Sequence, residues 1–252
     1  MTAPYFDDGA VQLYHGDMRE IIPELGLTAD LIIADPPYGE TSLSWDRWVD
    51  EWLDIAATVS RSMWCFGSMR MFLAWRDYFS GPGWKLSQDV IWEKHNGSGF
   101  AMDRFRRVHE TAAHWYLDGW ARVYRQVPRV AAIYDSKGRT LSGREARPPH
   151  TGKIGSATYH DDGLRLARSV LYVKSMQRAA IHPTEKPIDL LIPLIEYACA
   201  PDGLVLDPFA GSGSTLEAAR LTGRRAIGIE ISEQYAEAAA RRLAQQTIGA
   251  AS

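Results

Sequence analysis

Short runs of apolar residues recur along the chain, and most are followed by a glycine, a proline or an acidic residue. Runs of this kind are typical of strands buried on both faces of a parallel sheet. They predict strands at residues 11–14, 29–34, 62–68, 85–92, 111–117, 204–207 and 225–230. Helical spacing of apolar residues predicts helices at residues 18–25, 45–60, 70–79, 188–200, 216–220 and 232–246.

Because strands alternate with helices, the pattern predicts an α/β fold with a mostly parallel sheet and helices on both faces. The strands that end at Asp35 and Asp207 are expected to be neighbours, with their loops facing one cleft. A chain of 252 residues, 46% hydrophobic and 23% charged, is ordinary for a soluble globular protein. The absence of a membrane-length apolar stretch and of a signal peptide predicts a cytoplasmic protein with no membrane partner.

The first candidate site is Asp35-Pro36-Pro37-Tyr38, directly after the apolar run at 29–34. The two prolines fix two φ angles and so hold Asp35 and Tyr38 in a set relation. The Asp35 carboxylate and the Pro36 carbonyl can accept the two hydrogens of an exocyclic amino group while Tyr38 stacks on the base. Taken alone, the motif is equally consistent with a simple turn.

A second candidate site joins a strand, a glycine turn and a helix over residues 204–220. Glycines in the turn allow the backbone to approach a ligand closely, and an acid ends the next strand where a dinucleotide fold binds a ribose. The candidate cofactor contacts are Asp207, Pro208, Phe209, Gly211, Ser212, Gly213 and Glu230.

The form of this second motif favours S-adenosylmethionine over NAD as the cofactor. A nicotinamide site usually has a third glycine in register and a helix N-terminus facing a pyrophosphate, and neither feature is present after Asp207. An anion facing Asp207 would be repelled, whereas a cationic sulfonium would be attracted.

Three motifs in this order resemble the β-class of DNA amino-methyltransferases, in which the catalytic motif precedes the cofactor motif. They are the Asp35 turn, the sequence at 182–187 (His-Pro-Thr-Glu-Lys-Pro) and the sequence at 207–213 (Asp-Pro-Phe-Ala-Gly-Ser-Gly). The resemblance implies a circularly permuted methyltransferase fold with one antiparallel strand near residues 109–117. It also implies direct in-line methylation of N6 of an adenine flipped out of DNA.

Other residues gain roles only through the resemblance. It implies that Asp17 lies near the cofactor's adenine, although Asp17 also suits the N-cap of the helix at 18–25. It implies that Thr184 and Lys186 approach the methionine end, where Lys186 suits a carboxylate. In the polar loop at 93–99, Lys94 and Asn96 are expected to help hold the extruded base, whereas the pair at 109–110 is expected to be structural.

Charge is distributed unevenly along the chain. Residues 119–180 contain twelve Lys or Arg and four Asp or Glu, a net charge of +8 in a chain whose net charge is −3. A charge run is by default a solvated surface, but beside two chemical motifs it favours double-stranded DNA as the partner. The candidate DNA contacts are Lys94, Asn96, Arg104, Arg106, Arg107, Arg139, Arg144, Arg147 and Lys153. We therefore divide the chain into a catalytic half (1–118), a basic target-recognition insertion (119–180) and a cofactor-binding half (181–252).

The two cysteines, Cys65 and Cys199, are expected to be buried apolar residues, which argues against covalent catalysis at cytosine carbon 5. No metal site is predicted. Alternatives to adenine methylation are N4-cytosine methylation, a non-catalytic DNA-binding regulator, and methylation of RNA or protein. A homodimer and a cognate restriction endonuclease remain open as partners.

Overall fold

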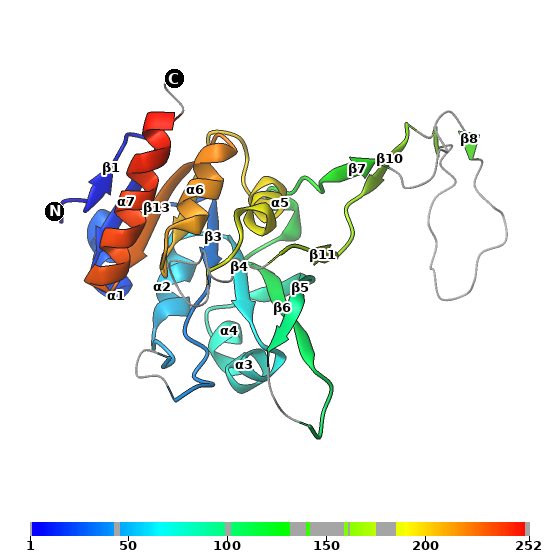
Figure 1. Cartoon of the computed structure of the whole chain (residues 1–252), viewed down its shortest axis with the longest axis horizontal. Helices are drawn as coiled ribbons and strands as arrows, with labels where there is room; N and C mark the ends of the chain where they lie inside the picture. The colour runs from blue at the N-terminus through cyan, green and yellow to red at the C-terminus, as the bar shows by residue number, and fades with distance from the viewer. Residues whose placement is uncertain are drawn as a thin grey trace. The chain divides into compact units, whose positions relative to one another are not determined.

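The computed structural model describes residues 2–42, 46–98, 102–131, 140–141, 159–160, 162–174 and 185–249 (Figure 1). Within these residues one sheet has the strand order β1-β2-β13-β12-β3-β4-β6-β5-β11. Its strands are β1 (Phe6–Asp7), β2 (Val11–His15), β3 (Leu31–Ala34), β4 (Ser62–Gly67), β5 (Lys85–Ser98), β6 (Arg107–Tyr116), β11 (Val170–Tyr172), β12 (Leu204–Asp207) and β13 (Arg225–Glu230). The helices are α1 (Met18–Leu25), α2 (Trp52–Val59), α3 (Met69–Ala74), α4 (Arg76–Ser80), α5 (Ile188–Ala198), α6 (Ser214–Leu221), α7 (Glu233–Gly249) and the 3-10 turn η1 (Trp120–Arg122).

The sheet is mostly parallel, which confirms the predicted fold class. Strands β2, β13, β12, β3 and β4 pair in parallel, and β3 lies next to β12 as predicted. Strand β6 runs antiparallel to both β4 and β5, where one antiparallel strand was expected. The short edge strand β1 is also antiparallel, and the sequence pattern did not predict it.

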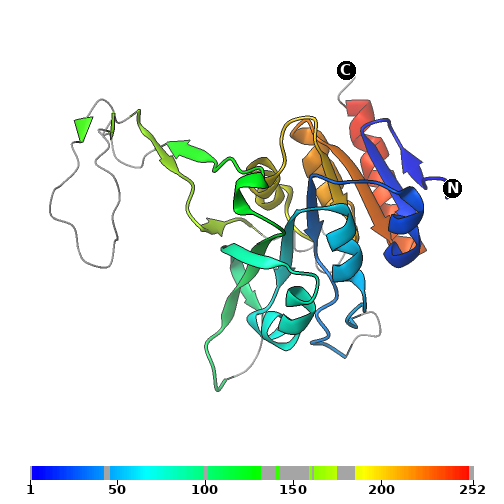
Figure 2. The ribbon, with the colours of Figure 1, turned by 180° about the vertical axis from the view of Figure 1, so that it is seen from behind.

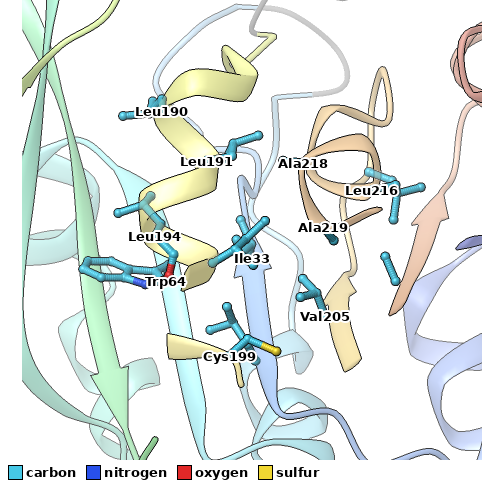
Figure 3. Packing of buried hydrophobic residues seen from close by; sticks show 14 of the residues in the cluster. Ile33, Trp64, Leu190, Leu191, Leu194, Cys199, Val205, Leu216, Ala218 and Ala219 are labelled. Atoms are coloured by element: carbon cyan, nitrogen blue, oxygen red, sulfur yellow. Dashed lines mark hydrogen bonds between the residues drawn. The ribbon is translucent and has the colours of Figure 1, made fainter. Parts of the chain in front are cut away.

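Successive residues of the central strand β3 pack into different halves of the core. Leu31 and Ile33 belong to a cluster formed with α5, α6 and α7, whereas Ile32 and Ala34 pack with α1, α2 and α3. This alternation is the two-residue period of a strand, so the sheet has helices on both faces (Figures 1 and 2). Figure 3 shows Ile33 packed beside the α5 leucines. Both cysteines are fully buried in these clusters, as predicted.

A second compact unit, Val127–Arg168, is separate from the unit formed by Met1–Gln126 and Ser169–Ser252. Within it, β7 (Arg129–Ala131) pairs antiparallel with β10 (Leu164–Leu166), and β8 (Thr140–Leu141) pairs with β9 (Tyr159–His160). An ion pair between Arg129 and Asp162, 2.7 Å long, links its two ends.

Several predicted element bounds were wrong. Helix α2 begins at Trp52 and not at residue 45, because the Asp46 side chain accepts backbone N–H groups of the preceding loop, including that of Gly39 at 2.9 Å. The helix predicted at 70–79 is broken at Trp75 into α3 and α4. Residues 93–98, predicted as part of a loop, instead continue strand β5, which pairs with β6 at Glu93 and again at Ser98 with an irregular register between them.

No helix in the described part of the chain is both long enough and apolar enough to cross a membrane.

Candidate active site

Four carboxyl groups gather where adjacent parallel strands end. Asp35 follows β3, Asp207 ends β12 and Glu230 ends β13. Asp17 lies two residues beyond β2, where the Gly16 N–H donates to the Glu230 carbonyl at 3.0 Å. Because ligands of open parallel sheets bind at the carboxyl ends of strands, this acidic edge is the candidate site.

Asp207 is the most deeply buried of the four, with 4% of its surface exposed. Burial raises its pKa to about 7, and repulsion from Asp35 and Glu230 adds to the rise. Hydrogen bonds from the Thr215 side chain and from the Phe209 N–H, at 3.0 Å, act in the opposite direction. A carboxylate held in this way favours a cation beside it.

Both oxygens of Glu230 accept backbone hydrogen bonds. The Gly211 N–H donates to Oε2 and the Ser232 N–H donates to Oε1, each at 2.8 Å. Burial nevertheless raises the pKa of Glu230. Each carboxylate oxygen retains a second lone pair, so Glu230 can still accept from a ribose hydroxyl.

The two glycines of the cofactor motif have left-handed backbones, with φ of 50° at Gly211 and 78° at Gly213. A Cβ on Gly213 would lie 3.2 Å from the Cβ of Ala239 in α7. The sequence predicted that these glycines allow the backbone to approach a ligand. At Gly213 the missing side chain instead allows the start of α6 to pack closely against α7. This packing fixes where α6 starts, immediately after the turn.

The remaining residues of this motif face the protein more than the open edge. Pro208 and Ser212 are buried, and the Ser212 hydroxyl lies 3.2 Å from that of Ser214. The Phe209 ring packs edge-on against Trp52, with 5.4 Å between ring centroids. These contacts hold the turn against the core.

The Asp35 turn leaves β3 at the point where two prolines prevent further strand pairing. Pro36 is buried and Pro37 partly buried. The Tyr38 hydroxyl donates to Asp35 Oδ1 at 2.9 Å, and burial together with the Asp35 charge raises the Tyr38 pKa well above its usual value. The tyrosine hydroxyl is thus held by the carboxylate. The Asp35 side chain remains 21% exposed.

The other Asp35 oxygen accepts a hydrogen bond from the Lys186 ammonium. Glu110 Oε2 lies 3.5 Å from the same ammonium, and Lys94 contacts Glu110 Oε1. Lys186 and Lys94 were predicted to contact the cofactor and the flipped base, respectively. Here their ammonium groups meet protein carboxylates, so Asp35 belongs to a chain of alternating charges.

A second buried charge cluster anchors the segment before α5. Arg242 of α7 donates to Glu185 at 2.7 Å and to Glu217 of α6 at 2.6 Å. The Glu185 and Glu217 side chains are 1% and 4% exposed. Since Glu185 directly precedes Lys186, this cluster fixes the backbone that delivers Lys186 to Asp35.

Asp17 is the N-cap of α1, as its sequence context predicted. Its carboxylate accepts the Arg19 N–H at 2.9 Å and forms an ion pair with the Arg19 guanidinium at 2.6 Å. These contacts with Arg19 hold the pKa of Asp17 below its usual range. As the N-cap, the Asp17 carboxylate lies just beyond the carboxyl end of β2, beside the candidate site.

The predicted DNA contacts near the hairpin are exposed. Arg104, Arg106 and Arg107 lie in or beside the loop that joins β5 to β6, and Arg104 pairs with Asp103 at 2.6 Å. The side chain of Asn96 and the residues Arg139, Arg144, Arg147, Lys153 and Thr184 lie outside the described part of the chain.

Sequence reasoning missed Glu185, Glu217 and Arg242, and it did not predict the contact between Glu110 and Lys186. Glu110 was expected to be only structural, and its position beside Lys186 depends on pairing between distant strands. Only Glu185 had a local signal, because it stands inside the motif at 182–187.

Comparison with known proteins agrees with this geometry. The N6/N4 methyltransferase family described as DNA methylase matches residues 29–241, most of the chain. Type II methyltransferase M2.DpnII of Streptococcus pneumoniae is 26% identical over 273 residues, which cover 96% of this chain and 93% of that protein.

Two solved structures have the same fold. The M1.HpyAVI–SAM complex is 26% identical with a TM-score of 0.65, covering 92% of this chain and 99% of its own. The cytosine-N4-specific PvuII DNA methyltransferase is 16% identical with a TM-score of 0.68, covering 96% and 89%. On the family match, this chain belongs to the N6/N4 DNA methylase family.

Proposed function

We propose that this protein transfers a methyl group from S-adenosylmethionine to the exocyclic N6 of adenine in double-stranded DNA, as a member of the permuted β-class. The observation that carries the proposal is the position of the Asp35 turn. It lies beside Asp207 at the carboxyl ends of the paired strands β3 and β12, with two hydrogen-bond acceptors and an aromatic ring together.

The acidic edge supports a cationic cofactor. Burial and the neighbouring carboxyl groups raise the pKa of Asp207. A sulfonium or ammonium group beside it would relieve this repulsion. Glu230 would accept from ribose hydroxyls and Asp17 would lie near the adenine. The solved M1.HpyAVI complex carries SAM, at 26% identity. When bound, S-adenosylmethionine supplies an electrophilic methyl group.

The chain's own residues would hold the amino group for attack. The target base leaves the duplex and stacks on Tyr38, while Asp35 and the Pro36 carbonyl accept its two N–H hydrogens. The nitrogen lone pair forms the new N–C bond, and the electron pair of the broken S–C bond stays on sulfur. The nitrogen then releases a proton, for which Asp35 is a nearby acceptor. Alignment supplies much of the rate.

Cytosine N4 is the second candidate acceptor, because it presents the same amino group and the cytosine-N4-specific PvuII enzyme has this fold. Adenine is favoured because cytosine members of the class more often have serine at the position of Asp35. Exposed arginines beside the β5–β6 loop and the basic segment 119–180 would contact DNA phosphates. The type II names of relatives favour a role in restriction and modification.

The test is transfer of labelled methyl groups to unmethylated genomic DNA, followed by nucleoside digestion and mass spectrometry. We expect N6-methyladenine from the wild type and none from Asp35→Ala. The control is Asp54→Ala, which removes an exposed carboxylate on α2 and should leave transfer unchanged. Label in N4-methylcytosine would correct the base, and absence of label in DNA despite cofactor binding would refute the proposal.

A further inference from the structure

The Lys186 ammonium is buried among groups from three neighbouring strands of the sheet. The residue is 7% exposed. Its nitrogen contacts the Asp35 carboxylate after β3, lies 3.5 Å from Glu110 Oε2 in β6, and lies 5.0 Å from the centre of the Phe66 ring in β4. A buried lysine so enclosed has little freedom to turn toward another partner.

Lys186 and Glu110 both remain charged despite their burial. Burial alone would lower the pKa of Lys186, but the Asp35 and Glu110 carboxylates bring it above its usual value. Burial alone would raise the pKa of Glu110, but Lys186 and Lys94 bring it below its usual value. Lys186 and Glu110 are therefore both ions at neutral pH.

We propose that Lys186 and Glu110 are positioning residues for Asp35: Lys186 fixes the orientation of the carboxylate, and Glu110 fixes Lys186 and offsets its charge. This inference rests on the proposed function, in which Asp35 holds the amino group. It replaces the expectation that Lys186 binds the methionine carboxylate.

The charge balance explains why two residues are needed. During transfer, positive charge develops on the amino nitrogen that Asp35 faces. Asp35 paired with Lys186 alone would present no net charge to that nitrogen, whereas the group of Asp35, Lys186 and Glu110 keeps one negative charge. Lys94 contacts the other oxygen of Glu110, so the four groups together sum to zero. Lys94 nevertheless contacts Glu110 and not Asp35, so its charge is separated from the amino nitrogen by the other three groups.

Orientation is the second contribution. Lys186 holds Oδ2 of Asp35 and Tyr38 holds Oδ1, which fixes the plane of the carboxylate. Each oxygen still has a second lone pair for a substrate N–H. Without Lys186 the carboxylate could rotate, and a small misplacement of a catalytic group costs about 10²-fold in rate.

The experiment measures single-turnover methyl transfer at saturating cofactor and DNA for Glu110→Gln, Lys186→Met and Lys186→Arg, together with cofactor affinity by calorimetry. We expect Glu110→Gln and Lys186→Met to lower the rate by about 10²-fold while cofactor affinity changes little, and Lys186→Arg to restore part of the rate. In the double variant Glu110→Gln/Lys186→Met, the fold-loss in rate should be smaller than the product of the two single fold-losses, because the residues act together. Lys85→Met, at an exposed lysine of β5, is the matched control.

Two outcomes would overturn the inference while the wild type remains active. One is a wild-type rate in Glu110→Gln. The other is a Lys186→Arg or Lys186→Met variant with weak cofactor binding and an unchanged rate at saturation, which would make Lys186 a cofactor ligand. A wild type that binds cofactor but transfers nothing to DNA would instead refute the proposed function, and this inference with it. Thermal melting of each variant separates loss of folding from loss of rate, and Glu110→Gln keeps the side-chain shape should Lys186→Met unfold.

Discussion

At the residue scale, the site brings carboxyl groups together where water is scarce. Asp207 is nearly fully buried, and the charges of Asp35 and Glu230 add to the burial that raises its pKa to about 7. A group whose pKa is raised by folding binds its proton more tightly in the folded state. Its stabilising contribution is complete at a pH below the unfolded pKa, near 3.8, and is lost as the pH rises through 7.

We therefore expect Asp207→Asn to remove part of the pH dependence of stability in the cofactor-free protein. Ionised Asp207 lowers the free energy of unfolding by roughly 4 kcal/mol above pH 7, since one pKa unit is worth about 1.4 kcal/mol. Urea unfolding of both proteins between about pH 5 and pH 8 measures the difference. The wild type should lose stability relative to the variant as the pH rises, and parallel curves would contradict the assignment of the raised pKa to Asp207.

The Asp35 turn could be predicted from the sequence because its geometry is local. Two prolines after an apolar run end a strand, and Tyr38 lies only three residues from Asp35. The partner of Asp35, Lys186, is 151 residues away, and no local pattern could indicate that contact.

At the element scale, α7 secures both the cofactor turn and the segment that carries Lys186. Ala239 of α7 packs against Gly213, and Arg242, one helical turn further on, reaches Glu185 and Glu217. The alanine-rich pattern predicted a covering helix, and apolar spacing could place it on the sheet. It could not show which segments Arg242 joins, because Glu217 and Glu185 lie 25 and 57 residues away.

Arg242→Met should therefore destabilise the protein strongly. It leaves two nearly inaccessible carboxylates without their cation, and breaking a buried ion pair in this way costs about 3–5 kcal/mol. The adjacent Arg241→Met is the matched control, because the Arg241 side chain is 73% exposed and its pair with Glu237 is on the surface. Such surface pairs are worth about 1 kcal/mol or less. Urea midpoints measure both, and equal midpoints would show that the buried cluster contributes little.

Two of the element bounds that were wrong share one cause. Residues 93–98 are polar and glycine-containing, which is typical of loops, yet they continue strand β5 and pair with β6 at both ends of the segment. Residues 45–51 have helical spacing of apolar residues, yet the Asp46 carboxylate is occupied by backbone N–H groups of the loop after Tyr38. In both places hydrogen bonds to another segment of the chain override the local preference.

At the scale of the whole molecule, charge is divided between an acidic remainder and the basic segment 119–180. A cationic surface binds DNA largely through release of counterions, so affinity falls as salt rises. The exposed Arg104, Arg106 and Arg107 add further positive charge at the β5–β6 loop.

Replacing these three arginines by glutamine should make DNA binding less sensitive to salt. For duplex DNA, each arginine that no longer neutralises a phosphate should reduce the slope of log affinity against log salt by about 0.9. Fluorescence anisotropy of a labelled duplex over a range of salt concentrations measures the slope. Arg76→Gln, at an exposed arginine of α4, should leave it unchanged, and an unchanged slope in the triple variant would exclude this loop from phosphate binding.

The sequence by itself determined the α/β fold class, the neighbouring strands β3 and β12 and the two chemical motifs that follow them. Apolar periodicity, prolines and glycines act over a few residues, so the fold class and the motifs could be predicted from local sequence. The pairing of β3 with β12 followed from the expected sheet, in which the loops after both strands face one cleft. Only the tertiary structure decided that Lys186 lies between Asp35 and Glu110, and that Glu185 is held by Arg242. Buried charges require partners wherever the fold can supply them, and in this protein the partners come from strands and helices far apart in the chain.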